Sequence, residues 1–518
     1  MLPAGCTRSG TGGGNAWTIP GELRIAERQD PDNLNVELGT ETVDFDLAAF
    51  WGASLFRLDD RGELYPELAT VEPTLANGGI SRDGLRITYH LRPNVKWQDG
   101  TLFDAGDVIY TWQQMLNPRN NVVSRVGYDV IAGIDRKDDH TIVVHLKRRF
   151  APFVNTFFAP ANHVNVILPR HLLARYPDIN RIDYNRLPIG TGPFRVAAYE
   201  PGVRVEFLAN DSYWRGPPKL RRIEFRFVAS DTTMLTMLQS HEIDFYYRAS
   251  ETLAPVLRNV PGTRVVLTPY DRFTDVGFNA ASPGLDDVRV RQALAYATDR
   301  KTLIEKVMHG IALPGDTNHA SFSWSYANGV KAYAYDPKRA ASMLAAAGWP
   351  PGKLHINLVS FTGSSTVAST EALLQSQWAK AGVDVSIKNV PSGQLYATAA
   401  AGGIEQSGKF DAIVENWENG GDPDDSVLLM CDMKPPAGWN VYHFCNADFD
   451  AAERIALTSY DRVIRANAYH RTQNILAEQL PFFVLWYQLQ IDVINTDFHN
   501  YKPAHAVTPF WNVWEWTI

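Results

Sequence analysis

Strand-like and helix-like patterns of hydrophobic and polar positions alternate along the whole chain, which predicts a mixed α/β protein. Residues 85–92 alternate with a period of two, as a half-buried strand does, and residues 194–199 and 411–417 are also predicted strands. Helical patterns lie at residues 232–240, 288–309, 337–347, 369–381 and 460–479. No repeat of fixed period interrupts this order.

The clearest local signals surround one helix. Asp104 is of a residue type that caps helix N-termini, and Asn117-Pro118 is typical of a helix end. Between them, four apolar side chains fall on one helical face: Val108, Trp112, Met115 and Leu116. The spacing predicts a helix over residues 105–116 that packs through this face.

The composition is that of a globular protein, and the charge argues against two classes of binding partner. The 518 residues favour about three domains, and 45% hydrophobic with 20% charged residues excludes disordered and fibrous classes. The net charge of −8 is spread without long single-sign runs, which argues against a nucleic-acid groove or a basic membrane surface. The 14 Trp, 21 Tyr and 24 Phe suit a core and also a binding cleft.

The N-terminus resembles the tail of a lipoprotein signal. Small residues stand directly before Cys6, and residues 7–14 are rich in Gly, Ser and Thr, as in a flexible tether. Cys6 would then carry the lipid, the alternative being an incidental thiol. No apolar run reaches about 18 residues, so we expect no bilayer-spanning segment.

Cys431 and Cys445 bracket a segment rich in turn residues. A disulfide between them would contribute about 3 kcal/mol in the chain-entropy model and would indicate an oxidising compartment. Two free buried thiols are the alternative. A zinc site lacks the required Cys and His spacing.

Several segments, taken in chain order, carry a family resemblance. They are Leu91–Thr101 with Asp107-Val108, Gly190–Phe194, Asn210–Gly216, Gln239–Asp244, Asp287–Leu294 and Asp299-Arg300. Together they resemble bacterial extracellular solute-binding protein family 5, which comprises the dipeptide, oligopeptide and nickel receptors of ABC importers. The resemblance covers nearly the whole chain from about residue 20.

This resemblance implies an α/β, two-lobed periplasmic-binding-protein-like fold (type II-like, cluster C) with a hinge and a cleft between the lobes. Residues 1–16 would be a signal remnant and tether. Lobe 1 would combine domain I (17–52, 190–269 and 493–518) with an inserted domain II (53–189). Lobe 2, domain III, would span 270–492. Hinge closure fits a receptor that reports its loaded state to a transporter.

The resemblance also implies that the ligand lies along the strand at residues 411–417. In peptide-binding relatives this strand pairs with the peptide backbone, so that main-chain hydrogen bonds give affinity without reading side chains. Glu415, Asn416, Trp417 and Glu418 occupy that position here, followed by Asn419, and Trp417 matches the family's tryptophan.

The chain departs from the family three residues after Trp417. Peptide-binding relatives have an aspartate there that pairs with the α-ammonium of the peptide, whereas this chain has Gly420. A desolvated ammonium without a carboxylate is costly. Glu418 or Asp422 would then replace the aspartate, unless the ligand has no amine.

A further interpretation is purely structural. Asp422, Asp424 and Asp425 are also suited to cap a turn or the helix predicted at residues 426–430.

Two more residues would face the cleft by analogy with the family, Trp439 and Asn440. Trp439 is equally suited to packing its loop against its own domain. Phe361 and Tyr396 are weaker candidates, better suited to core or cleft wall.

No nucleophile elbow, P-loop, zinc-protease motif or dinucleotide fingerprint occurs, and the 13 histidines are scattered. Those nearest the expected cleft segments are His309, His319, His443 and His470. We therefore expect no catalytic residue, metal site or cofactor, and a secreted hydrolase is the only enzyme alternative.

The resemblance thus implies a monomeric periplasmic or cell-surface receptor, and the N-terminal pattern adds a lipid anchor on Cys6. The receptor would capture peptides by lobe closure and deliver them to the membrane permease of an ABC importer, with no nucleic-acid partner. Two alternatives keep the fold: an oligosaccharide stacked on Trp417 and Trp439, and a nickel chelate held by a cleft histidine.

Overall fold

The computed structural model describes residues 14–125, 127–159, 165–505 and 508–518. Cys6 and its predicted lipid lie outside the described residues. Strands and helices alternate throughout the described chain, and the predicted α/β class is confirmed.

One large sheet extends through both halves of the molecule. Its strand order is β14-β13-β15-β11-β16-β10-β1-β9-β8-β7, with β12 beside β16. The strands are β1 Glu22–Glu27, β7 Phe194–Glu200, β8 Arg204–Ala209, β9 Arg222–Phe227, β10 Phe245–Tyr246, β11 Thr263–Phe278, β12 Ala312–Pro314, β13 His355–Phe361, β14 Asp384–Val390, β15 Ala412–Glu418 and β16 Phe482–Asn495.

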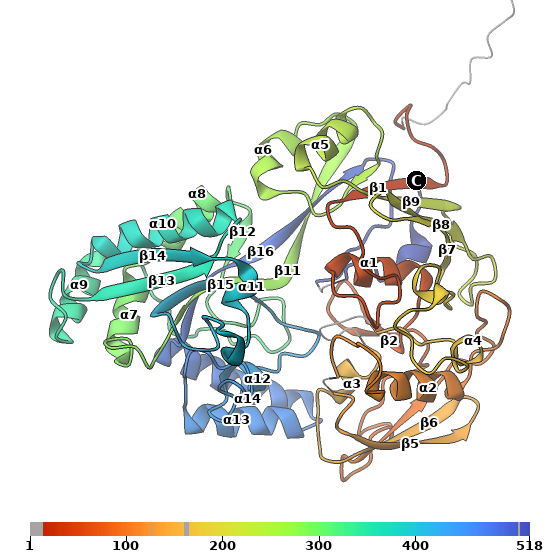
Figure 1. Ribbon diagram of the computed structural model, residues 1–518, viewed down its shortest axis with the longest axis horizontal. Helices are drawn as coiled ribbons and strands as arrows, with labels where there is room; N and C mark the ends of the chain where they lie inside the picture. Colours follow the sequence, from red (N-terminus) through yellow and green to blue (C-terminus); the bar gives the residue numbers. More distant parts are fainter. Residues whose placement is uncertain (1–13, 126, 160–164, 506–507) are drawn as a thin grey trace, which may run out of the picture.

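The long strands β11 and β16 connect the two halves. They pair antiparallel, from Thr263 opposite Asn495 to Gly277 opposite Phe482. One end of this pair continues into β10 and β1, and the other into β15. Figure 1 shows the result as two bodies joined by β11 and β16; we call the body with β1 lobe 1 and the body with β15 lobe 2. The ladder bulges between Pro269 and Phe273, where the strands cross between lobes.

Lobe 1 contains two smaller sheets besides its part of the large one. They are β2-β3 and β4-β6-β5, with β2 Phe56–Leu58, β3 Leu64–Pro66, β4 Arg86–His90, β5 Ile131–Asp138 and β6 Thr141–Leu146. Its helices are α1 Thr42–Trp51, α2 Ala105–Leu116, α3 Phe153–Thr156, α4 Arg170–Leu173, α5 Asp231–Gln239 and α6 Ala254–Leu257. Ile25 of β1 and Ile87 of β4 belong to one continuous hydrophobic core, so the small sheet and the β1 region are packed as a single body.

In lobe 2, helices and loops cover both faces of the sheet. Val276 and Val414 point into a core shared with α7–α10, whereas Phe273 and Ile413 point into a core shared with α13 and α14. The helices are α7 Val288–Tyr296, α8 Arg300–Val307, α9 Pro337–Ala346, α10 Ser365–Ala379, α11 Ser392–Leu395, α12 Ser426–Leu429, α13 Ala447–Thr458 and α14 Arg462–Gln479.

The helix predicted over residues 105–116 is confirmed with its cap. The Asp104 carboxylate accepts a hydrogen bond from the Gly106 N–H (2.6 Å), and the Asp107 carboxylate accepts one from the Asp104 N–H (3.0 Å). This reciprocal arrangement satisfies donors that a helix start leaves unpaired.

The helix predicted over residues 288–309 is instead two helices. α7 ends at Tyr296 and α8 begins at Arg300, because Asp299 caps the second helix through the Thr302 N–H (3.1 Å). The Trp378 indole also donates to the Thr298 hydroxyl (2.9 Å), which fixes the chain at the break. A cap residue inside a continuing apolar pattern is a weak sequence signal, so the prediction merged them.

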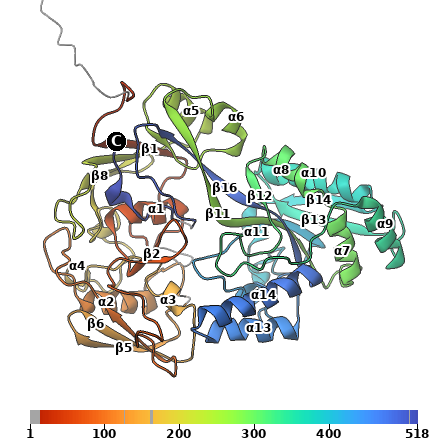
Figure 2. The same cartoon turned by 180° about the vertical axis from the view of Figure 1, so that it is seen from behind.

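The lobes touch where α13 and α14 meet α3, and both ribbon views place these helices beside one another (Figures 1 and 2). The Ala151 N–H donates to the Leu457 carbonyl (2.7 Å), and the Tyr460 hydroxyl donates to the Gly84 carbonyl (3.0 Å). Arg462 of α14 forms an ion pair with Glu63 (2.7 Å).

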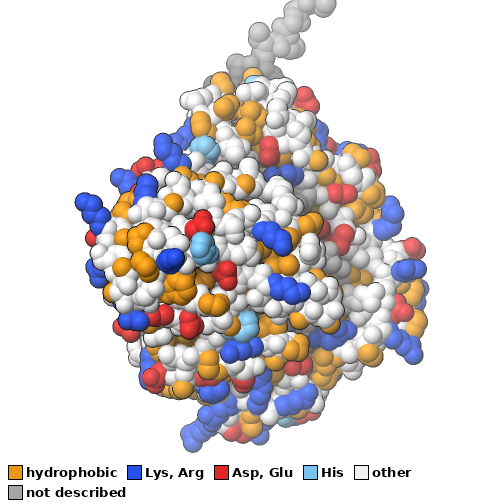
Figure 3. Space-filling view, turned by 60° about the vertical axis from the view of Figure 1, so that its left-hand side comes forward, with side chains coloured by type: hydrophobic (Ala, Val, Ile, Leu, Met, Phe, Trp, Pro, Cys, Tyr) orange, Lys and Arg blue, Asp and Glu red, His pale blue; other side chains and the backbone are white. Residues whose placement is uncertain are grey.

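The surface matches the dispersed charge of the sequence. On the face seen in Figure 3, acidic and basic side chains are interspersed with polar and apolar ones. None of the described helices combines the length and apolar character needed to cross a bilayer.

Candidate functional site

Within the described residues, β15 has one edge that is open along its last part, beside two cavities lined by residues of both lobes. On one side it pairs with β11 over its whole length, from Phe278 opposite Ala412 to Arg272 opposite Glu418. On the other side β13 pairs only with Ala412 and Ile413. Within the described residues, the last part of β15 therefore has no strand partner on that side.

The ladder determines which peptide groups of β15 point to the open edge. The Asn419 N–H donates to the Asp271 carbonyl (3.0 Å), so Asn419 and every second residue before it direct their peptide groups toward β11. Asn416 and Glu418 alternate with these residues. Their N–H and C=O groups are therefore directed to the open edge, where an added strand would bind.

A cavity of about 270 Å³ lies beside the end of β15, and we call it the acidic pocket. Its acidic and aromatic lining includes Glu37, Trp417, Glu418, Asp422, Asp424 and Trp439; much of the rest is apolar, from Val36, Phe45, Met115, Phe150 and Val427. No Lys or Arg is among its described lining residues. It combines residues of both lobes.

Two acids of the acidic pocket hold their protons unusually tightly. Burial raises the pKa of Glu37 from 4.5 to about 8, opposed only by a hydrogen bond from the Val166 N–H. Burial also raises the pKa of Asp424 from 3.8 to about 6, although the Ser426 N–H donates to it (2.9 Å). Both shifts favour the neutral acid, and an incoming cation would reverse them.

A larger cavity of about 370 Å³ lies next to the crossing strands, and we call it the hinge cavity. Its polar lining includes Glu27, Arg28, Arg248, Glu251, Tyr270, Arg272, Thr274, Asn416, Gln488 and Gln490, with Phe361 among its apolar residues. In its lining Thr274 donates to the Asn416 side-chain carbonyl (2.6 Å), and Gln488 donates to the same oxygen (3.2 Å).

The three arginines of the hinge cavity differ in their partners. Arg248 forms an ion pair with Asp46 (3.0 Å), and Arg28 forms one with Asp231 (3.4 Å). Arg272 is half-buried, and its guanidinium has neither an ion pair nor a hydrogen bond within the described residues. It is therefore the arginine available to an anionic group in this cavity.

Asp422 is committed to protein partners. Arg465 of α14 donates to its Oδ1 (2.5 Å), and Asn155 of α3 donates to its Oδ2 (2.9 Å) from the other lobe. The Tyr469 hydroxyl also donates to Oδ1 (3.4 Å). Of the two acids expected to replace the family's aspartate, Asp422 is thus neutralised by Arg465, whereas Glu418 accepts only from the Tyr270 hydroxyl (2.8 Å) within the described residues.

The loop after β15 is held by residues 318 and 319. Asn419 donates to the Asn318 carbonyl (2.6 Å), and Asp425 accepts from the Asn318 amide (2.7 Å) and from His319 Nε2 (2.9 Å). The Asp424 carboxylate accepts from the Ser426 N–H at the start of α12. The predicted capping role is therefore confirmed for Asp424, whereas the Asp425 carboxylate binds Asn318 and His319 and makes no capping hydrogen bond.

Glu415 lies on the face of β15 opposite Asn416 and Glu418, and it lines neither cavity. It accepts from the Tyr442 hydroxyl (2.6 Å) and is the cross-strand neighbour of Asp275, whose two carboxylate oxygens have no hydrogen-bond partner within the described residues. Glu405 joins this buried group, and burial together with the charge of Glu415 raises its pKa to about 9. The cluster lies behind the open edge rather than on it.

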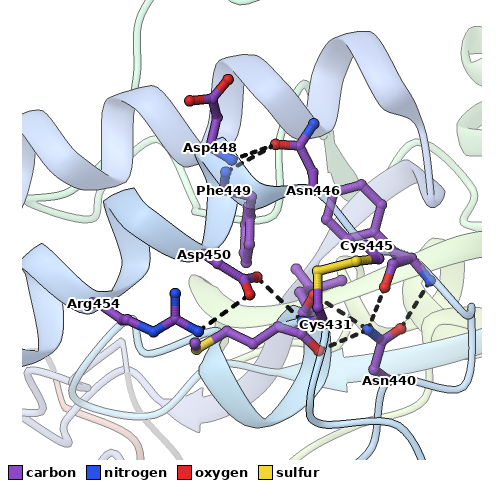
Figure 4. The surroundings of a disulfide bond; sticks show 11 residues. Cys431, Asn440, Cys445, Asn446, Asp448, Phe449, Asp450 and Arg454 are labelled. Atoms are coloured by element: carbon purple, nitrogen blue, oxygen red, sulfur yellow. Dashed lines mark hydrogen bonds and ion pairs between the residues drawn. A yellow bond between two sulfur atoms is a disulfide. The ribbon is translucent and has the colours of Figure 1, made fainter.

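Cys431 and Cys445 form the disulfide that the sequence predicts. Figure 4 shows Asn440 beside it, inside the closed loop. Asn440 is fully buried, and its amide donates to the carbonyls of Met430 (3.0 Å) and Phe444 (2.7 Å). It supports the loop instead of facing the cleft as expected, because these backbone contacts hold its side chain inside lobe 2. Trp439, by contrast, is 40% exposed and lines the acidic pocket.

The site thus gathers most of the predicted residues and adds others. Trp417, Glu418, Asn419, Asp422 and Trp439 line one pocket, and Asn416 lines the hinge cavity with Phe361. Glu37 and Arg272 are additions, and neither stands in a motif that would have indicated it. No group of three or more His, Cys, Asp or Glu in the described part of the chain is arranged to hold a metal ion.

Comparisons with known proteins agree on the family. The model of bacterial extracellular solute-binding proteins, family 5 (middle) matches residues 63–438. Di/tripeptide-binding protein 2 of Pseudomonas aeruginosa (strain UCBPP-PA14) is 28% identical over 462 residues, which cover 84% of this chain and 85% of the relative.

Solved structures agree on the fold. NikZ from Campylobacter jejuni in complex with Ni(L-His) superposes with a TM-score of 0.78 at 25% identity, covering 97% of this chain and 100% of that one. The oligopeptide-binding protein AppA from Bacillus subtilis in complex with a nonapeptide gives 0.75 at 23% identity, covering 96% and 99%.

Proposed function

Because the chain belongs to family 5 of the bacterial extracellular solute-binding proteins, we propose that it captures peptides between its lobes and delivers them to an ABC importer. Members of this family are solute receptors and not enzymes. A relative named as a di/tripeptide-binding protein aligns over most of both chains, which supports a peptide as the solute.

The observation that carries the proposal is the open edge of β15. Outward peptide groups at Asn416 and Glu418 offer hydrogen bonds to a second backbone and to no particular side chain. A receptor for varied peptides needs this division, because backbone bonds give affinity while roomy cavities accept the side chains.

The charges around this edge support a peptide with both ends free. The acidic pocket lies beside Glu418, and the hinge cavity with Arg272 lies beside Asn416. Arg272 is the cross-strand partner of Glu418, so a peptide lying along β15 would have acids and a guanidinium without an ion pair in the described chain near the same stretch of the edge, which suits an ammonium and a carboxylate.

Lobe closure is part of the proposal. We assign lobe 1 to residues 17–189, 190–269 and 493–518 and lobe 2 to residues 270–492, with the hinge at the bulge between Pro269 and Phe273. The shared core of the β1 and β4 regions supports rigid movement of domains I and II together. A lipid on Cys6 would hold the receptor at the membrane.

A thermal-unfolding screen of the purified protein tests this function. Free tripeptides, maltotriose and Ni²⁺ with L-histidine are the three probe classes. A ligand at 100 times its dissociation constant stabilises by about 2.7 kcal/mol, or about 2 to 3 °C for a chain of this size. A shift with peptides supports the proposal. A shift with maltotriose alone would favour stacking on Trp417 and Trp439, and a shift with nickel alone would favour a chelate receptor; either would overturn it.

A further inference from the structure

Glu37 is the most deeply buried acid of the acidic pocket, and half of its carboxylate has no partner. Glu37 is only 2% exposed, and its Oε1 accepts a hydrogen bond from the Val166 N–H (2.8 Å). Its Oε2 has no hydrogen-bond partner within the described residues. Buried polar atoms are nearly always paired, so an orphaned oxygen on a residue that lines a cavity indicates a missing partner.

The pocket around Glu37 offers no cation from its described lining. Among the described residues of lobe 1, Tyr128 and Tyr184 are titratable groups that interact with Glu37, and Glu418 and Asp424 face the same cavity from lobe 2. Asp422 is already neutralised by Arg465. Three acids without an ion pair in the described chain therefore share a pocket of about 270 Å³ whose described lining holds no Lys or Arg.

The remaining lining suits a charged group on an apolar stem. Val36, Phe45, Met115 and Phe150 contribute hydrocarbon and aromatic surface, and Trp417 and Trp439 add two aromatic rings. Aromatic faces attract cations, and apolar walls strengthen the attraction between a cation and a carboxylate by excluding water.

We propose that the acidic pocket binds an ammonium or guanidinium group of the ligand, and that Glu37 of lobe 1 is the acid that receives it. Glu37 thereby replaces, from the opposite lobe, the aspartate whose position Gly420 occupies. The cation lies between Glu37 on one side and Glu418 and Asp424 on the other, so it favours the closed arrangement of the lobes. The identity of the cation as part of a peptide rests on the proposed function; the cation pocket itself does not.

Proton release follows from this arrangement. Burial raises the pKa of the Glu37 carboxyl to about 8, so most of it is protonated at pH 7 before the ligand enters. A cation favours the charged carboxylate, and the proton leaves to buffer. Binding at pH 7 therefore releases up to about one proton, measured by calorimetry in phosphate and in Tris, whose ionisation enthalpies differ.

The variants Glu37→Gln and Asp424→Asn test the two sides of the pocket, with Glu305→Gln as control. Gln keeps the shape of the neutral acid, and Glu305 is an exposed acid on α8 that pairs with Lys301 (3.8 Å). The probes are Ala-Ala-Ala, Leu-Leu-Leu, Lys-Lys-Lys and Glu-Glu-Glu, their N-acetylated forms, and cadaverine as a cation without a peptide backbone.

For wild type and Glu305→Gln we expect N-acetylation to weaken binding at least tenfold for peptides without another cation. In Glu37→Gln this penalty and the proton release disappear, and in Asp424→Asn the penalty shrinks. A penalty retained in full by Glu37→Gln, or absent from wild type, overturns the inference while leaving peptide binding intact. If Glu37→Gln does not fold, proton release by the wild-type protein is the test: release on binding at pH 7 supports the inference, and its absence overturns it.

The two proposals fail separately. If wild type binds no peptide, the proposed function fails and cadaverine decides the inference. Stabilisation of wild type and not of Glu37→Gln by cadaverine supports the cation pocket, whereas no stabilisation of either protein overturns it.

Discussion

Asn155 of lobe 1 donates a hydrogen bond to the carboxylate of Asp422 in lobe 2 (2.9 Å), so the two lobes are linked through a buried acid. The second oxygen of that carboxylate receives the Arg465 guanidinium. Asp422 therefore fixes the loop after β15 to α14 and to the opposite lobe. Its charge is used inside the protein and is not left for a ligand.

Asp422→Asn is expected to lower the free energy of unfolding by about 3 to 5 kcal/mol, because it leaves the buried Arg465 without its counter-ion. Urea unfolding followed by tryptophan fluorescence measures the change. Asp448→Asn is the matched control: its pair with Arg471 is 2.8 Å long but exposed, and its loss should cost about 1 kcal/mol or less. Unchanged stability of Asp422→Asn with lost peptide binding would instead make Asp422 a ligand partner.

Arg272→Gln is expected to weaken binding of peptides with a free carboxylate by about tenfold or more. The substitution removes a guanidinium of the hinge cavity that has no ion pair within the described residues and could pair with that carboxylate. Peptides with an amidated C-terminus should bind wild type and variant alike. Isothermal titration of each peptide and its amide measures the difference. Arg258→Gln, which changes an exposed arginine, is the control. Equal preference for the free acid in Arg272→Gln would rule out this role.

Local signals in the sequence were sufficient for parts of the fold and of the site. The cap at Asp104 and the helix that it starts depend on a neighbour three residues away. The strand β15, with Trp417, was predicted from the local pattern of residues 411–417. The partners that decide function are remote. Arg465 lies 43 positions from Asp422, and Glu37 reaches the acidic pocket from the other lobe. No periodicity or cap links residues so far apart, so the sequence left Asp422 as a candidate and offered no reason to name Glu37.

Loss of the disulfide is expected to destabilise lobe 2 and to loosen the acidic pocket. The bond closes the loop that carries Trp439 and Asn440, and restricting that loop in the unfolded chain contributes about 3 kcal/mol. Cys431→Ser with Cys445→Ser should therefore unfold at lower urea concentration than wild type and bind peptides more weakly. Dithiothreitol should shift wild type toward the variant and leave the variant unchanged. Equal midpoints for the oxidised protein and the double variant would contradict the prediction.

The buried acids behind β15 are expected to make stability fall as pH rises. Burial and the charge of Glu415 raise the pKa of Glu405 from 4.5 to about 9. The folded protein therefore keeps a proton that the unfolded chain releases above about pH 4.5. The stabilisation is complete below that pH and is lost as pH rises toward 9.

In Glu405→Gln, residue 405 no longer binds a proton in either the folded or the unfolded state. The variant's free energy of unfolding should fall less steeply between about pH 5 and pH 8 than that of wild type, by up to about 1.4 kcal/mol per pH unit. Urea titrations at several pH values measure the slope, and Glu305→Gln should keep the wild-type slope because that acid is exposed. Asp275 and Glu415 lie in the same buried cluster as Glu405. When residue 405 is neutral, the charge of Glu415 still raises the pKa of Asp275. A wild-type slope in Glu405→Gln would mean that the proton is held on Asp275 or Glu415 instead.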